Sequence, residues 1–316
     1  MLNRIQPHGK DDVSLIAEAI FNKNKLGFRY AYRGLMKQAR YFSPAYRDFI
    51  LKIIKNGSLK IVPTYDQGFF MDLGGFEANT SLSKRRKICV VTNISNPDTL
   101  GHELGHAVDM WFGSRTALSS HVLLEGDKTL NDIFLEEFES KHDELYELVM
   151  KEYQNIISSN INKHAYQILM ANFDKYRELM EMENKKLIKH RKRLQKELYE
   201  CGFVEVYYQL ITKKCHAILN QKYGPILDAL SAKYNFSYFY LLHHDQEYYQ
   251  LCKNRLVQEF FANLFAAKVT GKHVYIDNLI KYLPRSFNAF EKLFVIIYDH
   301  LQNNKRFTDV KIKEVN

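Results

Sequence analysis

The residues best suited to chemistry lie in segment 101–109, which has the sequence GHELGHAVD. It contains the pattern His-Glu-x-x-His, formed by His102, Glu103 and His106. On a helix, two histidines four residues apart project from one face and can bind the same metal ion. Glu103 can then reach a water on that ion without being a ligand. The segment predicts a metal centre with two histidine ligands and with Glu103 beside the water on the ion.

A catalytic zinc site needs a third protein ligand and one open position for water. The metzincin pattern would place Gly at position 109 and His at position 112, where this chain has Asp109 and Phe112. The alternative is a carboxylate from a later helix, and Glu259 is the one carboxylate in the apolar segment 256–267. Because a buried carboxylate needs a cation beside it, Glu259 is the predicted third ligand. The small Ala262 would let its helix approach the histidine helix closely.

These motifs resemble the zinc metalloprotease domain of anthrax toxin lethal factor and its relatives, which include the Pro-Pro endopeptidases. The resemblance rests on HELGHAVD after SNPDTL and on the later EFFA, and it covers about residues 60–113 and 245–302. It implies a zinc-dependent endopeptidase with Zn²⁺ bound by His102, His106 and Glu259, and with Glu103 as general base. It also implies a bacterial effector or toxin that cleaves a specific host protein.

The chain departs from the family pattern at two positions. The family has a carboxylate one turn after the ligand glutamate, where this chain has Asn263, whose side chain can still accept a hydrogen bond from a ligand histidine. The family also has a tyrosine shortly before that helix, which would stabilise the oxyanion, and at that spacing this chain has Cys252. Tyr248 and Tyr249 are the nearest tyrosines, and the choice between them stays open.

The elements around these motifs predict a mostly helical chain. Short strands are expected near residues 60–65, 68–76 and 87–92, and a helix from about residue 97 to 113 carries the histidines. From 131 to 235 apolar residues recur at helical spacing, with a polar break at 158–160. The expected fold class is α+β, predominantly helical: a zincin-like metalloprotease domain with a small mixed sheet and a large helical insertion.

Three regions follow from this interpretation. Residues 1–58 form an N-terminal helical region, residues 59–130 and 236–316 form the zincin-like catalytic domain, and residues 131–235 form the insertion. The separation between the histidines and Glu259 is much longer than in the family, which is why we interpret the intervening helices as an insertion. We expect this insertion to recognise the substrate. Asp109, one turn after His106, is expected either to orient an imidazole or to lie on the surface.

Composition narrows the partners and the compartment. The 316 residues are 46% hydrophobic, carry a net charge of +9 and include four cysteines without a CxxC pair, which favours reduced thiols. No apolar run approaches the ~20 residues that span a bilayer, and no classical signal peptide is visible. We expect a soluble chain in the cytoplasm, or one delivered into a host cytosol by a specialised secretion system.

Basic runs at 84–87 and 185–196 leave other interpretations open. We expect a protein substrate with an acidic docking surface, no nucleic acid and no membrane span, while the oligomeric state stays open. The alternative is a non-catalytic regulatory, scaffold or nucleic-acid-binding protein that retains a metallopeptidase-like site, although no known nucleic-acid-binding motif is present.

Overall fold

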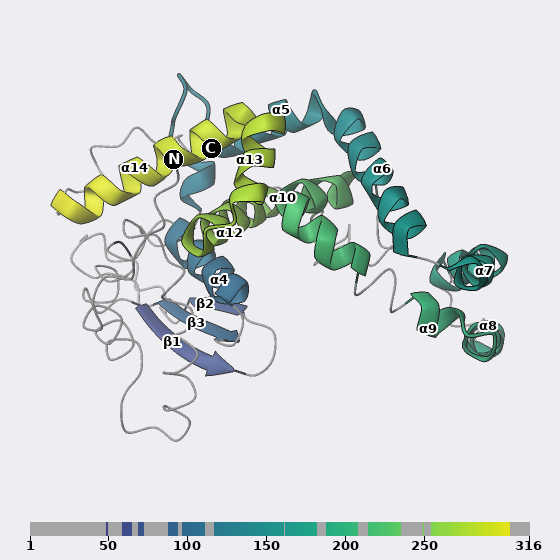
Figure 1. Cartoon of the computed structure of the whole chain (residues 1–316). Coiled ribbons are helices and arrows are strands. Elements are labelled where there is room, and N and C mark those ends of the chain that lie inside the picture. Colours follow the sequence, from purple (N-terminus) through teal and green to yellow (C-terminus); the bar gives the residue numbers. More distant parts are fainter. Residues whose placement is uncertain are drawn as a thin grey trace. The chain divides into compact units, whose positions relative to one another are not determined.

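The computed structural model describes residues 49, 59–64, 69–72, 88–93, 97–110, 117–160, 162–181, 188–207, 214–234, 249 and 254–303 (Figure 1). The chain divides into two compact units, the first from residues 1–140 and 254–316 and the second from residues 141–253. Of the expected N-terminal helical region 1–58, only Phe49 lies within the described residues.

In the first unit, three short strands pair through their backbones. They are β1 (Leu59–Thr64), β2 (Phe69–Asp72) and β3 (Ile88–Asn93). The order is β1-β3-β2, with β1 parallel and β2 antiparallel to β3. The helix α4 (Pro97–Asp109) follows β3 and packs beside β2 and β3 (Figure 1).

The expected α+β fold class is wrong. Of the residues whose side chains the structure describes, 88% are helical and none lies in a strand. The reason is the origin of the core: every large, fully buried side chain in this part of the chain comes from a helix. By its described core the fold is therefore all-α rather than α+β, and the small sheet of β1, β3 and β2 adds no described side chain to that core.

The described helices of the first unit include α4, η1 (Leu118–Ser120), α5 (Leu130–Glu139), α12 (Arg255–Thr270), α13 (His273–Tyr282) and α14 (Pro284–Asn303). Ten of the sixteen residues of α12 are buried, so this helix forms the centre of the unit. Two phenylalanines of α12 connect it to neighbouring helices. Phe260 stacks on Phe134 of α5, with the ring centroids 4.4 Å apart, and Phe261 contacts Phe290 of α14, with the ring centroids 5.0 Å apart.

The second unit contains α6 (His142–Asn160), α7 (Lys163–Glu181), α8 (Ile188–Glu200), α9 (Phe203–Tyr207) and α10 (His216–Tyr234). The predicted division into two long helices is confirmed, but it falls just after 158–160: α6 runs through Asn160 and α7 begins at Lys163. Within this unit α6 packs with α10, and α7 packs with α8 and α9. The expected insertion, 131–235, also included α5, which here belongs to the first unit.

Among the described residues, none of the helices is both long and apolar enough for a bilayer crossing.

A buried carboxylate of α5 holds the first turn of α14. Glu137 of α5 is 3% exposed and accepts hydrogen bonds from the backbone N–H groups of Arg285 and Ser286 and from the Ser286 hydroxyl. These amides belong to the first turn of α14, whose N–H groups have no partner within their own helix. Glu137 therefore caps α14 from another element, with a negative charge at the positive end of the helix dipole.

We predict that Glu137→Ala destabilises the chain by about 3 kcal/mol, because it leaves buried donors of α14 unpaired. Urea unfolding with metal removed measures this loss. Glu136→Ala is the matched control, since Glu136 is the neighbouring carboxylate but pairs with Lys128 at the surface. A Glu137→Ala variant as stable as the control would contradict the capping role.

Candidate metal centre

The contact between α4 and α12 is unusually close. A Cβ added to Gly105 would lie 2.6 Å from the Cα of Ala262, and one added to Gly101 would lie 3.0 Å from the Cα of Ala266. Both pairs are four residues apart on their helices, so glycines face alanines over a full turn. The small Ala262 was expected to permit a close approach, and this is confirmed. The two glycines opposite were not recognised from the sequence, although their four-residue spacing is the signal that could have revealed them.

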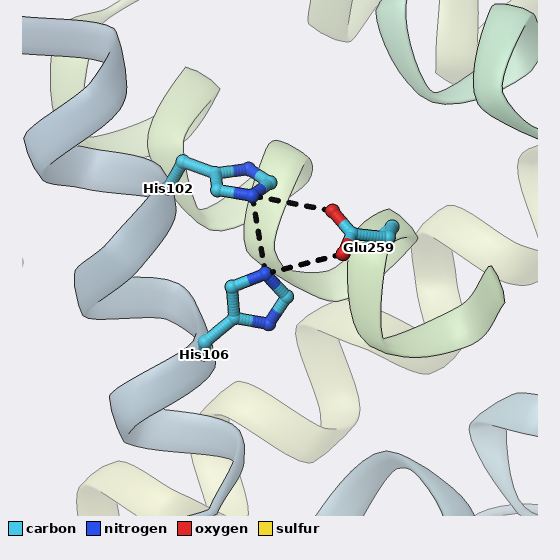
Figure 2. Close-up of side chains that lie close together, drawn as sticks. All are labelled: His102, His106 and Glu259. Carbon is cyan, nitrogen blue, oxygen red and sulfur yellow. Dashed lines mark hydrogen bonds and ion pairs between the residues drawn. The ribbon is translucent and has the colours of Figure 1, made fainter. Parts of the chain in front are cut away.

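This close contact brings three side chains together (Figure 2). His102 and His106 project from α4 toward Glu259 of α12, and their ligand atoms lie within 4.8 Å of one another. The two Nε2 atoms are 3.1 Å apart. The Nε2 of His102 is 3.2 Å from Oε2 of Glu259, and the Nε2 of His106 is 3.5 Å from Oε1.

These separations fit a metal ion. Ligand atoms about 2.1 Å from a tetrahedral centre lie about 3.4 Å from one another, close to all three observed distances. The group could therefore hold a metal ion. The exposure of the three side chains is also compatible with a bound ion. The Glu259 side chain is 4% exposed, while those of His102 and His106 are 23% and 17% exposed. One side of the group thus remains open to solvent through the histidines.

Asn263 orients the first histidine. Its Oδ1 lies 3.0 Å from Nδ1 of His102, which donates the hydrogen bond because a carbonyl oxygen can only accept. In the neutral ring the proton then resides on Nδ1, and Nε2 directs a lone pair toward His106 and Glu259. A hydrogen bond that fixes the tautomer of a ligand histidine is a common feature of metal sites. The predicted acceptor role of Asn263 is confirmed.

Two carboxylates of the site differ in electrostatic environment. Burial alone would raise the pKa of Glu259, but the charges and hydrogen bonds of His106 and His102 outweigh it and hold this pKa well below its usual value. Glu103 is 6% exposed, and burial raises its pKa; His102 and His106 lower it and Glu259 raises it further, leaving a net increase. Glu259 is thus kept ionised, whereas Glu103 has a stronger affinity for a proton than an exposed glutamate.

Asp109 is buried, and its carboxylate hydrogen-bonds with Ser119 rather than with an imidazole. It is 1% exposed, and its two carboxylate oxygens accept from the backbone N–H and the hydroxyl of Ser119, both at 2.7 Å. Burial raises its pKa to about 6 in spite of these bonds and of the attraction to His106. Asp109 therefore connects the C-terminal end of α4 to η1. The sequence did not predict this contact, because Ser119 lies ten residues later, beyond the range of helical spacing.

Of the two tyrosines predicted to bind the oxyanion, the structure describes one. Tyr249 is buried in the second unit, where its hydroxyl donates to Asp228 at 3.1 Å. Tyr248 lies outside the described residues, and so do the basic run 84–87 and Cys252. An oxyanion-binding role for either tyrosine stays a prediction.

Comparison with known proteins adds no relative: no protein-family model matches the chain, and no curated protein and no solved structure is significantly similar to it. The resemblance to the lethal factor family therefore stays a hypothesis that rests on the motifs quoted above.

We predict that Gly105→Ala weakens metal binding, although alanine favours a free helix by about 1 kcal/mol. The added methyl group must push α12 away, and ligand distances in metal sites tolerate only about 0.2 Å. Affinity for Co²⁺, followed by its visible absorption, should fall by about tenfold or more. Gly101→Ala, whose methyl group meets Ala266 less closely, should have a smaller effect. Equal affinities in all three proteins would show that the close contact does not set the site.

Asp109 predicts a pH-dependent stability in the metal-free protein. Its pKa of about 6 in the folded state lies above the reference value of 3.8, so between these values the folded state binds more protons than the unfolded state. Stability contributed by protonated Asp109 is therefore lost as the pH rises from about 4 to about 6, by roughly 2–3 kcal/mol. Asp109→Asn cannot ionise, so its advantage over wild type in urea unfolding should grow across this window. Parallel stability profiles would contradict the assignment.

Proposed function

We propose that this chain is a zinc-dependent endopeptidase whose metal is held by His102, His106 and Glu259. One observation carries the proposal: two Nε2 atoms and a buried carboxylate converge at the spacing of a tetrahedral ion, and the hydrogen bond that His102 donates to Asn263 supports the orientation of this histidine. Without a cation, these lone pairs and this charge would face one another.

The choice of zinc follows from the ligand types. Two imidazoles and one carboxylate suit a borderline ion such as Zn²⁺, whereas Mg²⁺ and Ca²⁺ prefer oxygen ligands throughout. Three protein ligands, with the histidines partly exposed, are typical of catalytic sites; structural zinc sites usually have four protein ligands. When bound, zinc would supply Lewis-acid activation of water and of the scissile carbonyl.

Glu103 is the proposed general base. It precedes the second histidine by three residues on α4 and is not itself part of the ligand group. Burial raises the pKa of Glu103, so its carboxylate takes a proton from the attacking water more readily than an exposed glutamate would. The same carboxyl group then donates that proton to the leaving amine, which completes hydrolysis of a peptide bond.

The proposal assigns no oxyanion donor. The hydroxyl of Tyr249 already donates to Asp228, and Tyr248 lies outside the described residues. The substrate is proposed as a protein, and its identity as a host protein cleaved by a bacterial effector rests on the motif resemblance alone.

Zinc content and cleavage separate the roles of the two glutamates. Wild type should contain about one zinc per chain by elemental analysis, and Glu259→Ala should lose most of it, because two imidazoles alone bind weakly. Glu103→Gln should keep the zinc but lose about 10²- to 10⁴-fold in cleavage rate, since the general base is removed. Cleavage is measured by mass spectrometry on a library of proteome-derived peptides.

Glu139→Gln serves as the control, because Glu139 is an exposed glutamate at the end of α5. Zinc bound without any cleavage by wild type would favour the non-catalytic alternative. Full activity in Glu103→Gln would exclude the proposed mechanism, and undiminished zinc in Glu259→Ala would exclude the proposed third ligand.

A further inference from the structure

The second unit carries a basic surface that the proposed peptidase site does not use. Four basic side chains of α8, spaced three or four residues apart, are all exposed: Lys189, Lys192, Arg193 and Lys196. Leu194 and Leu198, on the other side of the helix, are 3% and 1% exposed. This spacing places the four cations along one face of α8, which we call the α8 face.

Few acidic groups neutralise the α8 face. Segment 185–196 contains seven lysines and arginines and no acidic residue. Arg193 forms an exposed ion pair with Glu197 and Lys196 one with Glu200, whereas Lys189 and Lys192 have no ion-pair partner among the described residues. Exposed pairs of this kind contribute little, so the cations stay available to an external partner.

One aromatic side chain continues this surface. Tyr199 follows Lys192 by seven residues, hence on the same face, and is 75% exposed. Cationic side chains beside an exposed aromatic one are typical of helices that lie on a membrane surface.

The charges of the second unit are unevenly distributed, which would orient this unit on an anionic surface. The first turns of α6 carry the exposed acids Asp143, Glu144 and Glu147, whereas the cations gather on α8. An anionic surface would attract the α8 face and repel the start of α6.

We propose that the α8 face binds the anionic surface of a lipid bilayer through phosphatidylserine-type headgroups. Nucleic acid fits less well, because the cationic part spans only about 10 Å of helix and then gives way to Tyr199 and Glu200. A bilayer interface accepts both the lysines and the neighbouring Tyr199 ring. The proposal is independent of the metal centre and concerns peripheral contact only.

Vesicle co-sedimentation of the full chain tests the proposal. Wild type should sediment with phosphatidylcholine vesicles containing roughly one third phosphatidylserine, and should stay in solution with phosphatidylcholine alone. The double variant Lys189→Glu/Lys192→Glu should bind the anionic vesicles about tenfold or more weakly. Salt raised from about 0.1 M to about 0.5 M should weaken wild-type binding, because it screens exposed charges.

The matched control is Lys151→Glu/Lys281→Glu, which makes the same change in net charge at exposed lysines on α6 and α13. It should retain at least most of the wild-type binding. Equal losses in both double variants would mean that net charge alone acts, and would overturn the α8 assignment. Absence of phosphatidylserine-dependent sedimentation would overturn membrane binding, and salt-sensitive retention of duplex DNA in its place would assign the surface to nucleic acid.

Discussion

The close contact of α4 with α12 is the constraint on which the rest of the site depends. Gly105 lies so near Ala262 that no side chain fits between the helices, and Gly101 repeats this one turn earlier. Only at this separation can imidazoles from one helix and a carboxylate from the other share an ion. Phe260 and Phe261 also hold α12 in the core of its unit, because Phe260 stacks on Phe134 and the Phe261 ring packs tilted against Phe290.

Burial gives Glu259 its significance. A carboxylate that is 3% exposed loses most of its hydration, and the two histidines supply the compensation in the metal-free protein. A metal ion bound here would be another way to compensate the same buried charge. Because metal ligands must be deprotonated, such an ion would compete with protons for this group.

The site was more predictable from the sequence than the fold. His102, His106 and Glu259 follow from local spacing and from one charged residue in an apolar segment, both visible in the sequence. The expected fold class was wrong because strand propensity near residues 60–92 does not tell which elements supply the core, and among the described side chains helices supply it. Glu137 was equally invisible: it appears in the sequence as one more acid in a polar stretch, and its partner Ser286 lies far along the chain.

Asp109 shows how stability and chemistry are linked in α4. The helix must end with His106 correctly placed, and the bonds from Ser119 to Asp109 fix that end to η1. A buried carboxylate costs stability once it ionises, and an asparagine could keep both bonds with less cost. The negative charge nevertheless lies within the electrostatic reach of His106. A metal ion bound beside His106 would be attracted by this charge. An asparagine at this position would hold the end of α4 without supplying that attraction.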